Sequence, residues 1–247
     1  MTLPAAILVL SAAAGLCAGS YATTAALRQT QGRGATWGRS RCDHCGVSLG
    51  FLATAPVVSF VHRRGACTDC GGTIDPLHVV GELVGAGLAL SAVAFAAPVR
   101  ALPLTVLGLL LLFSAAVDAK SRRLPDWTSL AIAALGAGLA ATTSTATLLT
   151  GLASALVVFV VLELVRRSIL RGRGQPGLGF GDVKLLAVLS IWTGLYTSWV
   201  VALAAVLALA VVAVRRPVDG RIAFGPFIAI GAWIVGLGME AQLWPAL

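Results

Sequence analysis

Long apolar stretches separated by short polar ones dominate the chain. A helix that crosses the hydrocarbon core of a bilayer needs about 20 mainly apolar residues. The uncharged run Leu185–Val214 is too long for one such helix, and Gly194 near its middle predicts a turn between two spans. The other predicted spans are Pro4–Thr24, Leu77–Ala97, Ala101–Val117, Trp127–Thr143, Ala146–Val165 and Phe224–Gln242. The pattern therefore predicts about eight transmembrane helices.

The basic residues support this count and give an orientation. If residue 1 faces outside, the cytoplasmic segments are 28–76, 118–126, 166–184 and 215–223. These segments hold every lysine and arginine except Arg100. Because cytoplasmic loops carry an excess of Lys and Arg, we expect an even number of spans with the N-terminus outside. The N-terminus lacks the basic region of a signal peptide, so we expect the first helix to be retained.

Composition excludes a soluble protein. Of the 247 residues, 58% are hydrophobic and only 11% are charged, with a mean hydropathy of +0.92. A soluble domain usually carries about 25% charged residues. The net charge of +8 does not indicate nucleic acid, because no basic stripe with interleaved aromatic residues occurs. We predict an all-α polytopic protein of the cytoplasmic (inner or plasma) membrane, with the lipid bilayer as its main partner.

Three regions follow from this pattern. Residues 1–27 form the first transmembrane helix, residues 28–76 form a polar cytoplasmic loop, and residues 77–247 form a multi-helix membrane domain. The long loop contains two Cys-x-x-Cys pairs, each followed by glycine: Cys42, Cys45, Cys67 and Cys70.

The four loop cysteines predict a structural zinc site. Two knuckles of this kind supply four soft ligands with tetrahedral geometry. The alternatives are two disulfides or free thiols, and the reducing cytoplasm disfavours disulfides. His44 and His62 are expected to be bystanders because four thiolates fill the coordination shell. Cys17, in the first helix, is expected to be a small buried apolar residue.

Carboxylates within or beside membrane spans are costly and therefore informative. Glu163 precedes Arg167 by four residues, which predicts an ion pair on one helix face. Glu240 is expected to reach the outer interface, and Glu82 to form hydrogen bonds within the bundle. Asp182 follows a glycine-rich segment and could be a helix N-cap. Asp118 ends a span beside the negative pole of a helix dipole, where a carboxylate is disfavoured.

Topology brings Asp118 and Asp182 to the same depth. Asp118 leaves the third span and Asp182 enters the sixth, both at the cytoplasmic edge. Two neighbouring carboxylates do not both ionise readily, so one keeps a proton while the other acts as a base. This is the arrangement of an aspartic peptidase, in which one carboxylate activates water and the other polarises the scissile carbonyl. Gly179 and Gly181 would let a substrate strand or a neighbouring helix approach.

Several blocks together resemble the type IV prepilin peptidase family over nearly the whole chain. Residues 179–185 (GFGDVKL) are similar to its GxGD block, and residues 118–126 to the block with its first catalytic aspartate. The other similar blocks are 19–28, with a GSF-like opening, 41–45 and 64–71 with the cysteine knuckles, Glu82 in the YPxVE stretch, and 224–227 (FGPF). Thr23-Thr24 and His78-Val79 stand where the family has Asn-Val and Tyr-Pro.

The resemblance implies a specific activity and partners. Such enzymes remove the basic leader of type IV prepilins or pseudopilins, and many methylate the new N-terminal amine with S-adenosylmethionine. It implies Asp118 and Asp182 as catalytic residues, with Gly179, Gly181, Lys184 and Glu82 in support. The substrate could instead be another target such as a preflagellin.

Two further classes remain as alternatives. An ion-coupled transporter would place its acids near the membrane midplane between internal repeats, and no repeat is visible. A non-catalytic assembly factor with a zinc knuckle would work without either aspartate.

Overall fold

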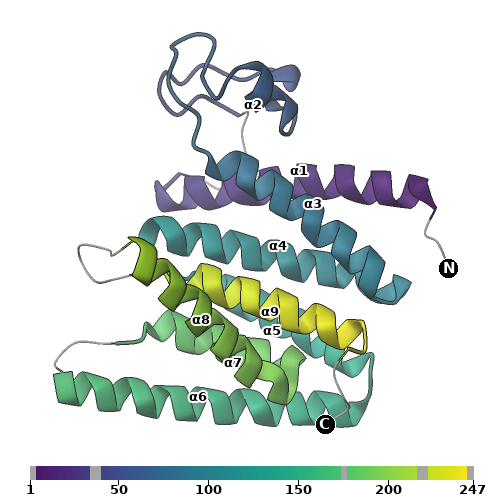
Figure 1. Cartoon of the computed structure of the whole chain (residues 1–247), viewed down its shortest axis with the longest axis vertical. Helices are drawn as coiled ribbons and strands as arrows, with labels where there is room; N and C mark the ends of the chain where they lie inside the picture. The colour runs from purple at the N-terminus through teal and green to yellow at the C-terminus, as the bar shows by residue number, and fades with distance from the viewer. Residues whose placement is uncertain (1–3, 34–39, 174–176, 216–221, 244–247) are drawn as a thin grey trace.

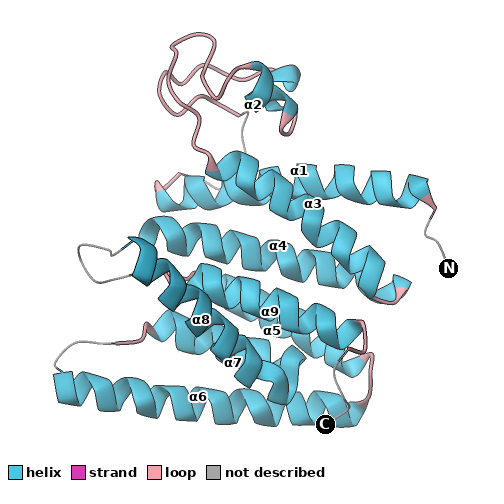
Figure 2. Cartoon of the chain, in the orientation of Figure 1, coloured by secondary structure: helices cyan, strands magenta, loops and turns pink. Residues whose placement is uncertain are grey.

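The chain forms a bundle of long helices with a small lobe beside one end (Figure 1). The computed structural model describes residues 4–33, 40–173, 177–215 and 222–243, and no strand occurs among these residues (Figure 2). The helices are α1 (Ala5–Thr30), η1 (Phe51–Thr54), α2 (Val58–His62), α3 (Leu77–Phe95), α4 (Pro98–Ser121), α5 (Asp126–Ala141), α6 (Thr145–Arg173), α7 (Phe180–Thr193), η2 (Gly194–Tyr196), α8 (Thr197–Arg215) and α9 (Gly225–Glu240).

Much of the helical surface suits a bilayer. Within the described residues, five segments are long and apolar enough to span one: Ala5–Thr30, Leu77–Phe95, Pro98–Ser121, Thr145–Gly172 and Phe180–Val214. α5 and α9 are apolar but shorter, with 16 residues each. Large apolar side chains such as Leu10 and Leu130 are exposed on the helices. The predicted all-α membrane fold is confirmed, whereas the count of eight spans stays a prediction.

The long apolar run breaks at Gly194, as its sequence predicts. Gly194 has φ 54° and ψ −132°, a backbone conformation that glycine adopts most easily. α7 ends there, and α8 begins at Thr197 after the short turn η2. The break divides the apolar run into two helices, α7 and α8.

Glycines set the contact between α1 and α3. Gly15 and Gly19 on α1 face Gly81 and Gly85 on α3, a small-xxx-small pattern on both helices. A Cβ on Gly85 would lie 2.7 Å from the Cα of Gly19, so the two backbones touch where side chains would separate them. This contact fixes the helices that carry the lobe.

α4 lies between two packed layers. On one side Val117 and Phe113 pack with Ala25 and Ala26 of α1. On the other side α4 contributes to the main apolar core that it shares with α5, α7, α8 and α9, namely Leu104, Leu107, Leu111, Ile132, Leu139, Leu185, Leu186, Leu189, Trp192, Val200, Ala204, Ile228, Ala229, Ala232 and Val235, with Ala92 from α3.

Two ion-pair clusters involve the helices, one within α6 and one between α4 and α9. Glu163 pairs with Arg167, as predicted, and also with Arg166, at 2.6 and 2.7 Å. At the opposite end of the bundle Arg100 donates two hydrogen bonds to Glu240, so this acid joins α4 to α9 rather than reaching a lipid interface. Because both partners are largely buried, the pair is a packing contact and corrects the expectation for Glu240.

Candidate active site and metal centre

Asp118 lies in the last turn of α4 and is buried, with 5% of its surface exposed. The helix ends at Ser121, and its C-cap residue, Arg122, has a left-handed backbone (φ 53°, ψ 34°). The backbone N–H of Gly225, the first residue of α9, donates to Oδ2 of Asp118 over 2.8 Å. Since the first N–H groups of a helix lack partners within it, the start of α9 is suited to hold a carboxylate.

Gly225 is a site residue to which sequence reasoning gave no role. A Cβ at this position would lie 2.8 Å from Oδ2 of Asp118, too close for an ordinary contact. The signal was present in residues 224–227, because a glycine that opens an apolar helix suggests a close approach. The sequence does not show that the approaching group is the carboxylate of Asp118.

Asp182 is the third residue of α7. The N-cap of this helix is Gly179 (φ −67°, ψ 141°), so the reading of Asp182 as the N-cap is wrong. Its carboxylate instead turns back to the backbone of Gly179, and a Cβ on Gly179 would lie 2.8 Å from Oδ2. This is the contact of an acid at the third helical position with the cap residue.

The two aspartates line one cavity. Its volume is about 330 Å³, and it opens between the end of α4, the following turn and the start of α7. Its lining residues are Asp118, Arg122, Arg123, Leu124, Gly179, Phe180, Gly181, Asp182 and Lys184. The predicted residues around the aspartates thus lie together, and only Glu82 lies elsewhere.

Contacts among neighbouring helices hold the rim of this cavity. Lys184 forms an ion pair with Asp126, the first residue of α5. Its Nζ lies 5.1 Å from the ring centre of Phe180, and Arg166 of α6 lies 5.3 Å from the same ring. A Cβ on Gly181 would lie 3.1 Å from Cβ of Leu124, so the start of α7 packs tightly on the turn after α4.

The four loop cysteines form a second cluster. All four Sγ atoms lie within 4.8 Å of one another, and those of Cys42 and Cys70 are 3.9 Å apart. A zinc ion with Zn–S bonds of about 2.3 Å separates its sulfur ligands by about 3.8 Å. The thiolates therefore fit a tetrahedral metal ion, and zinc suits a set of four cysteines.

Each Cys-x-x-Cys pair sits in the same tight turn. Gly46 N–H donates to the carbonyl of Cys42, and Gly71 N–H to that of Cys67, both over 2.9 Å. Gly46 and Gly71 have φ 72° and 69°, which favours glycine. Backbone amides of Cys45 and His44 lower the pKa of the Cys42 thiol to about 6, which favours a thiolate ligand.

The structure agrees with the prediction for His44 but not with that for Cys17. His44 Nε2 lies 3.1 Å from the carbonyl oxygen of Thr73, and the cluster of candidate ligands among the described residues contains only cysteines. Cys17 is exposed on α1, so the expectation that it is buried is wrong. The face of α1 that packs against α3 is occupied by glycines, and Cys17 lies off that face.

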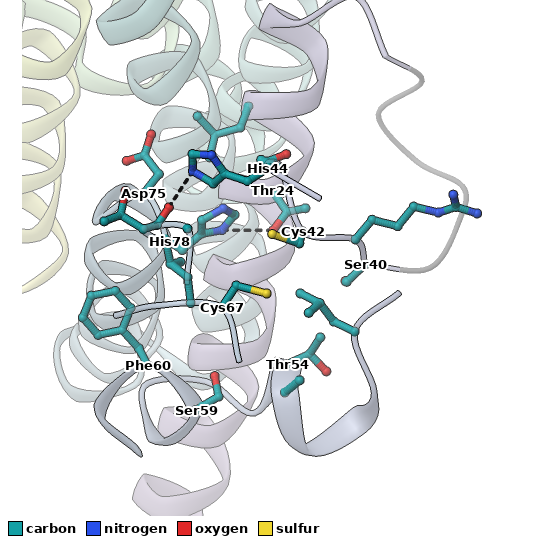
Figure 3. Close-up of a pocket in the computed structure, with 18 of the residues that line it drawn as sticks. Thr24, Ser40, Cys42, His44, Thr54, Ser59, Phe60, Cys67, Asp75 and His78 are labelled. Atoms are coloured by element: carbon teal, nitrogen blue, oxygen red, sulfur yellow. Dashed lines mark hydrogen bonds between the residues drawn. The ribbon is translucent and has the colours of Figure 1, made fainter. Parts of the chain in front are cut away.

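Glu82 joins three parts of the molecule. It is 7% exposed, and Ser20 Oγ of α1 donates to its Oε1 over 2.7 Å. The backbone N–H of Val57, from the four-cysteine lobe, donates to Oε2 over 2.7 Å. The expected hydrogen bonding of Glu82 is confirmed, and it fixes the lobe against α1 and α3. Glu82 also lines a second cavity of about 480 Å³ between the lobe and the ends of α1 and α3, called the lobe cavity below (Figure 3).

Comparisons with known proteins agree with this architecture. Residues 105–214 match the family model of the type IV leader peptidase family, and residues 13–96 match that of the bacterial peptidase A24 N-terminal domain. A protein of Burkholderia pseudomallei is 34% identical over 78% of this chain and 65% of its own length. Proteins of Pseudomonas aeruginosa and Pseudomonas putida are 31% and 30% identical, over 79% and 80% of this chain and 70% and 71% of their own lengths.

All three relatives are named prepilin leader peptidase/N-methyltransferase. The chain spans about two thirds of their length, 65% for the Burkholderia protein. No solved structure matches the chain. Fold and site define a helical membrane protein with two aspartates, one buried and one half-buried, at one cavity, and with a separate four-cysteine lobe. The chain belongs to the type IV leader peptidase family.

Proposed function

We propose that the protein is a membrane aspartic endopeptidase that removes the leader of a prepilin or pseudopilin, with Asp118 and Asp182 as the catalytic pair. The observation that carries the proposal is the cavity of about 330 Å³ that both carboxylates line from separate helices. The substrate class rests on the names of the relatives.

The cavity suits hydrolysis of a peptide bond. One carboxylate takes a proton from water as the water attacks the scissile carbonyl, and the other, protonated, donates a hydrogen bond to the carbonyl oxygen. Gly225 N–H keeps Asp118 in place, and the Gly179 backbone does the same for Asp182. Gly179 lets the Asp182 carboxylate lie against its backbone, and Gly181 lets the start of α7 pack on Leu124, so both glycines help to hold Asp182 at the cavity.

The proposal includes the membrane arrangement. The proposed arrangement has eight spans, with residue 1 outside the membrane. The zinc-bound lobe, residues 28–76, then lies in the cytoplasm, on the same side as the aspartates. The distribution of arginine and lysine supports this orientation. The names of the relatives support a second step, methylation of the new N-terminal amine with S-adenosylmethionine.

A cleavage assay in detergent tests the proposal. A prepilin is incubated with the wild type, Asp118→Asn, Asp182→Asn and, as a matched control, Asp69→Asn, an exposed acid of the lobe outside both cavities. We expect the wild type to cut the prepilin before its apolar helix. The cleavage rate should fall at least about 100-fold in Asp118→Asn and Asp182→Asn, and the control should cleave like the wild type. Equal cleavage by all four proteins would contradict the assignment of the pair.

A further inference from the structure

Arg100 is the one basic residue that falls outside the predicted cytoplasmic segments, and the proposed reaction gives it no role. It lies in the first turn of α4, about five helical turns from Asp118 at the other end of the same helix. Its guanidinium binds Glu240, the last residue of α9, through two hydrogen bonds of 2.7 and 2.8 Å. Only 17% of the Arg100 side chain and 9% of the Glu240 side chain are exposed. Charges buried in a membrane protein are costly and often mark a function.

The same guanidinium also holds the end of α5. Its Nη1 donates to the carbonyl oxygen of Leu139 over 2.8 Å, and to the hydroxyls of Thr142 and Thr143 over 2.7 and 3.2 Å. The last carbonyls of a helix lack partners within it and form the negative end of the helix dipole, so a cation is favoured there. Arg100 thus joins α4, α5 and α9 at the ends that lie away from the aspartates, called the outer ends below.

The opposite ends of these three helices lie around Asp118. α4 carries Asp118 in its last turn, and α9 begins at Gly225, whose N–H donates to Oδ2 of Asp118 over 2.8 Å. The turn between α4 and α5, residues 122–124, lines the aspartate cavity. Polar contacts therefore join α4 and α9 at both ends, with Asp118 and Gly225 at one end and Arg100 and Glu240 at the other.

Between these two contacts the buried face of α9 is apolar, and most of its residues are small. They are Gly225, Ile228, Ala229, Gly231, Ala232, Val235, Gly236 and Gly238. Apolar contacts between helices in a membrane lack a hydrophobic driving force, so they restrain the register of a helix less than directed polar bonds do. A guanidinium that binds both oxygens of a carboxylate has a strict geometry. A slip of α9 by one residue would move its start by about 1.5 Å along the helix axis and break the contact with Asp118.

We propose that Arg100 is a positioning residue for the peptidase reaction. Its pair with Glu240 sets the register of α9 on α4, and this register places the Gly225 amide on Asp118. The inference rests on the proposed function, because Asp118 is the catalytic group that is positioned. Arg100 does not line the aspartate cavity, so it acts through α9 alone. A displacement of about 1 Å at a reacting group can slow a reaction about 100-fold, which makes the register important for the cleavage step.

A double substitution separates positioning from stability. Removing only Arg100 or only Glu240 leaves a buried charge without its partner, which destabilises a fold. Arg100→Met/Glu240→Met removes both charges and keeps long side chains, and apolar replacement of a whole buried ion pair is often neutral or stabilising. We therefore expect this variant to unfold in detergent at about the temperature of the wild type.

Ser144→Ala is the matched control. Ser144 follows Thr142 and Thr143 in the same turn, and its hydroxyl accepts a hydrogen bond from the N–H of Thr147 at the start of α6. The substitution removes a polar contact at the same outer edge of the bundle without touching α9. We expect Ser144→Ala to behave like the wild type in every measurement below.

Cleavage kinetics test the catalytic consequence. We expect kcat for a prepilin to fall at least about 30-fold in Arg100→Met/Glu240→Met, because Asp118 is no longer held by the Gly225 amide. KM should stay within about threefold of the wild type, because Arg100 does not line the cavity that takes the substrate. A purely structural pair would leave kcat unchanged once the fold is stable. A stable double variant with the kcat of the wild type overturns the proposal.

The register of α9 can be measured without any turnover. Glycine follows phenylalanine only at Phe180-Gly181 and Phe224-Gly225. Carbon-labelled phenylalanine carbonyls together with nitrogen-labelled glycines therefore select two amide signals in NMR, and Gly225→Ala assigns them. We expect the Gly225 amide to exchange with deuterated water at least about tenfold faster in Arg100→Met/Glu240→Met, because its contact with Asp118 is lost. The Gly181 amide, on α7, should change by less than about twofold and is the internal control.

The two measurements separate this inference from the proposed function. Exchange of the Gly225 amide at the wild-type rate overturns the role of Arg100, and so does an equal increase at Gly225 and Gly181, which would show a general loosening. A wild type that cuts no prepilin contradicts the proposed function, whereas faster exchange at Gly225 alone still supports Arg100 as the residue that sets the register of α9.

A second variant decides if the double variant does not fold. Arg100→Lys keeps the positive charge but loses the paired hydrogen bonds of the guanidinium. We expect faster exchange at Gly225 and a lower kcat in this variant as well. Wild-type values of both quantities in Arg100→Lys overturn the proposal.

Discussion

The aspartate cavity and the lobe cavity are built in opposite ways. The first joins residues far apart in the sequence: Asp118 on α4, Asp182 on α7 and the Gly225 amide on α9. The second is formed by one continuous stretch, from Thr24 to Glu82. A site made from three packed helices depends on the whole bundle, whereas a site made from one stretch depends on what holds that stretch together. In the lobe, the candidates are the metal ion and Glu82.

If the proposed methyl transfer takes place at the lobe cavity, this difference predicts different sensitivities. Small changes in helix packing should slow cleavage but leave the rate of methyl transfer unchanged. Loss of the metal ion should slow methyl transfer but leave the rate of cleavage unchanged. Each prediction below tests that separation.

The largest effect is expected from Gly225→Ala. The added Cβ would lie 2.8 Å from Oδ2 of Asp118, so the carboxylate or the start of α9 has to move. Because a displacement of about 1 Å at a reacting group can cost about 100-fold, we expect cleavage to fall by about that factor. Methyl transfer to a pre-cleaved peptide should stay within about twofold of wild type.

Gly138→Ala is the matched control for Gly225→Ala. Gly138 lies in α5, and a Cβ there would meet nothing within 4 Å. Alanine favours helix by about 1 kcal/mol over glycine, so this variant should be stable and active. Equal loss of both activities in Gly225→Ala would show that the two cavities are not independent.

Metal removal is the second test. Plasma emission spectrometry should find about one zinc per chain in the wild type and none in a Cys42→Ser/Cys45→Ser variant, since four thiolates fit one ion. The variant should lose binding of S-adenosylhomocysteine but keep most of its cleavage. Acid should release the metal as the thiolates gain protons. A variant that keeps its binding would break the comparison.

Sequence reasoning succeeded where a pattern alone fixes the geometry. The cysteine spacing predicts the cluster, and Gly194 predicts the break between α7 and α8, because in each case the deciding contacts are local. The depth of Asp118 and Asp182 follows from topology, which needs only the alternation of apolar and basic segments. Their catalytic role stays a prediction.

Sequence reasoning failed where the hydrogen-bond or ion-pair partner of a residue comes from a distant part of the chain. The Gly225 amide on Asp118 and the Val57 amide on Glu82 depend on how α9 and the lobe pack, which no local pattern shows. Glu240 was expected at the interface, and its pairing with Arg100 on α4 could not be foreseen for the same reason.

A smaller effect is expected at the rim of the aspartate cavity. Asp126→Asn breaks the ion pair with Lys184, but Asp126 is 82% exposed. Exposed pairs contribute about 0.2–1 kcal/mol, which corresponds to at most about a fivefold change in cleavage. The exchange Asp126→Lys/Lys184→Asp should restore part of the loss, measured as initial rates. A loss of 100-fold would show that one of these residues acts on the substrate directly.

The smallest effect is expected at the ion pair between the end of α4 and the four-cysteine lobe, Lys120 with Asp75. Burial acts to raise the pKa of Asp75, but the hydrogen bond and charge of Lys120 and the Leu77 amide outweigh it, so the pKa lies below its usual value. A depressed carboxyl pKa stabilises the fold above its ordinary value of about 3.9, and this contribution is lost as the pH falls through the lowered pKa.

The pair is therefore intact at neutral pH, and Lys120→Met should change both activities by no more than about twofold there. With Lys120→Met, thermal unfolding in detergent should depend less on pH below about 4 than in the wild type, because the paired carboxyl is no longer depressed. Arg171→Met, which removes an exposed charge on α6, serves as the control. If Lys120→Met instead abolishes methyl transfer to a prepilin but not to a pre-cleaved peptide, the contact guides the amine from one cavity to the other.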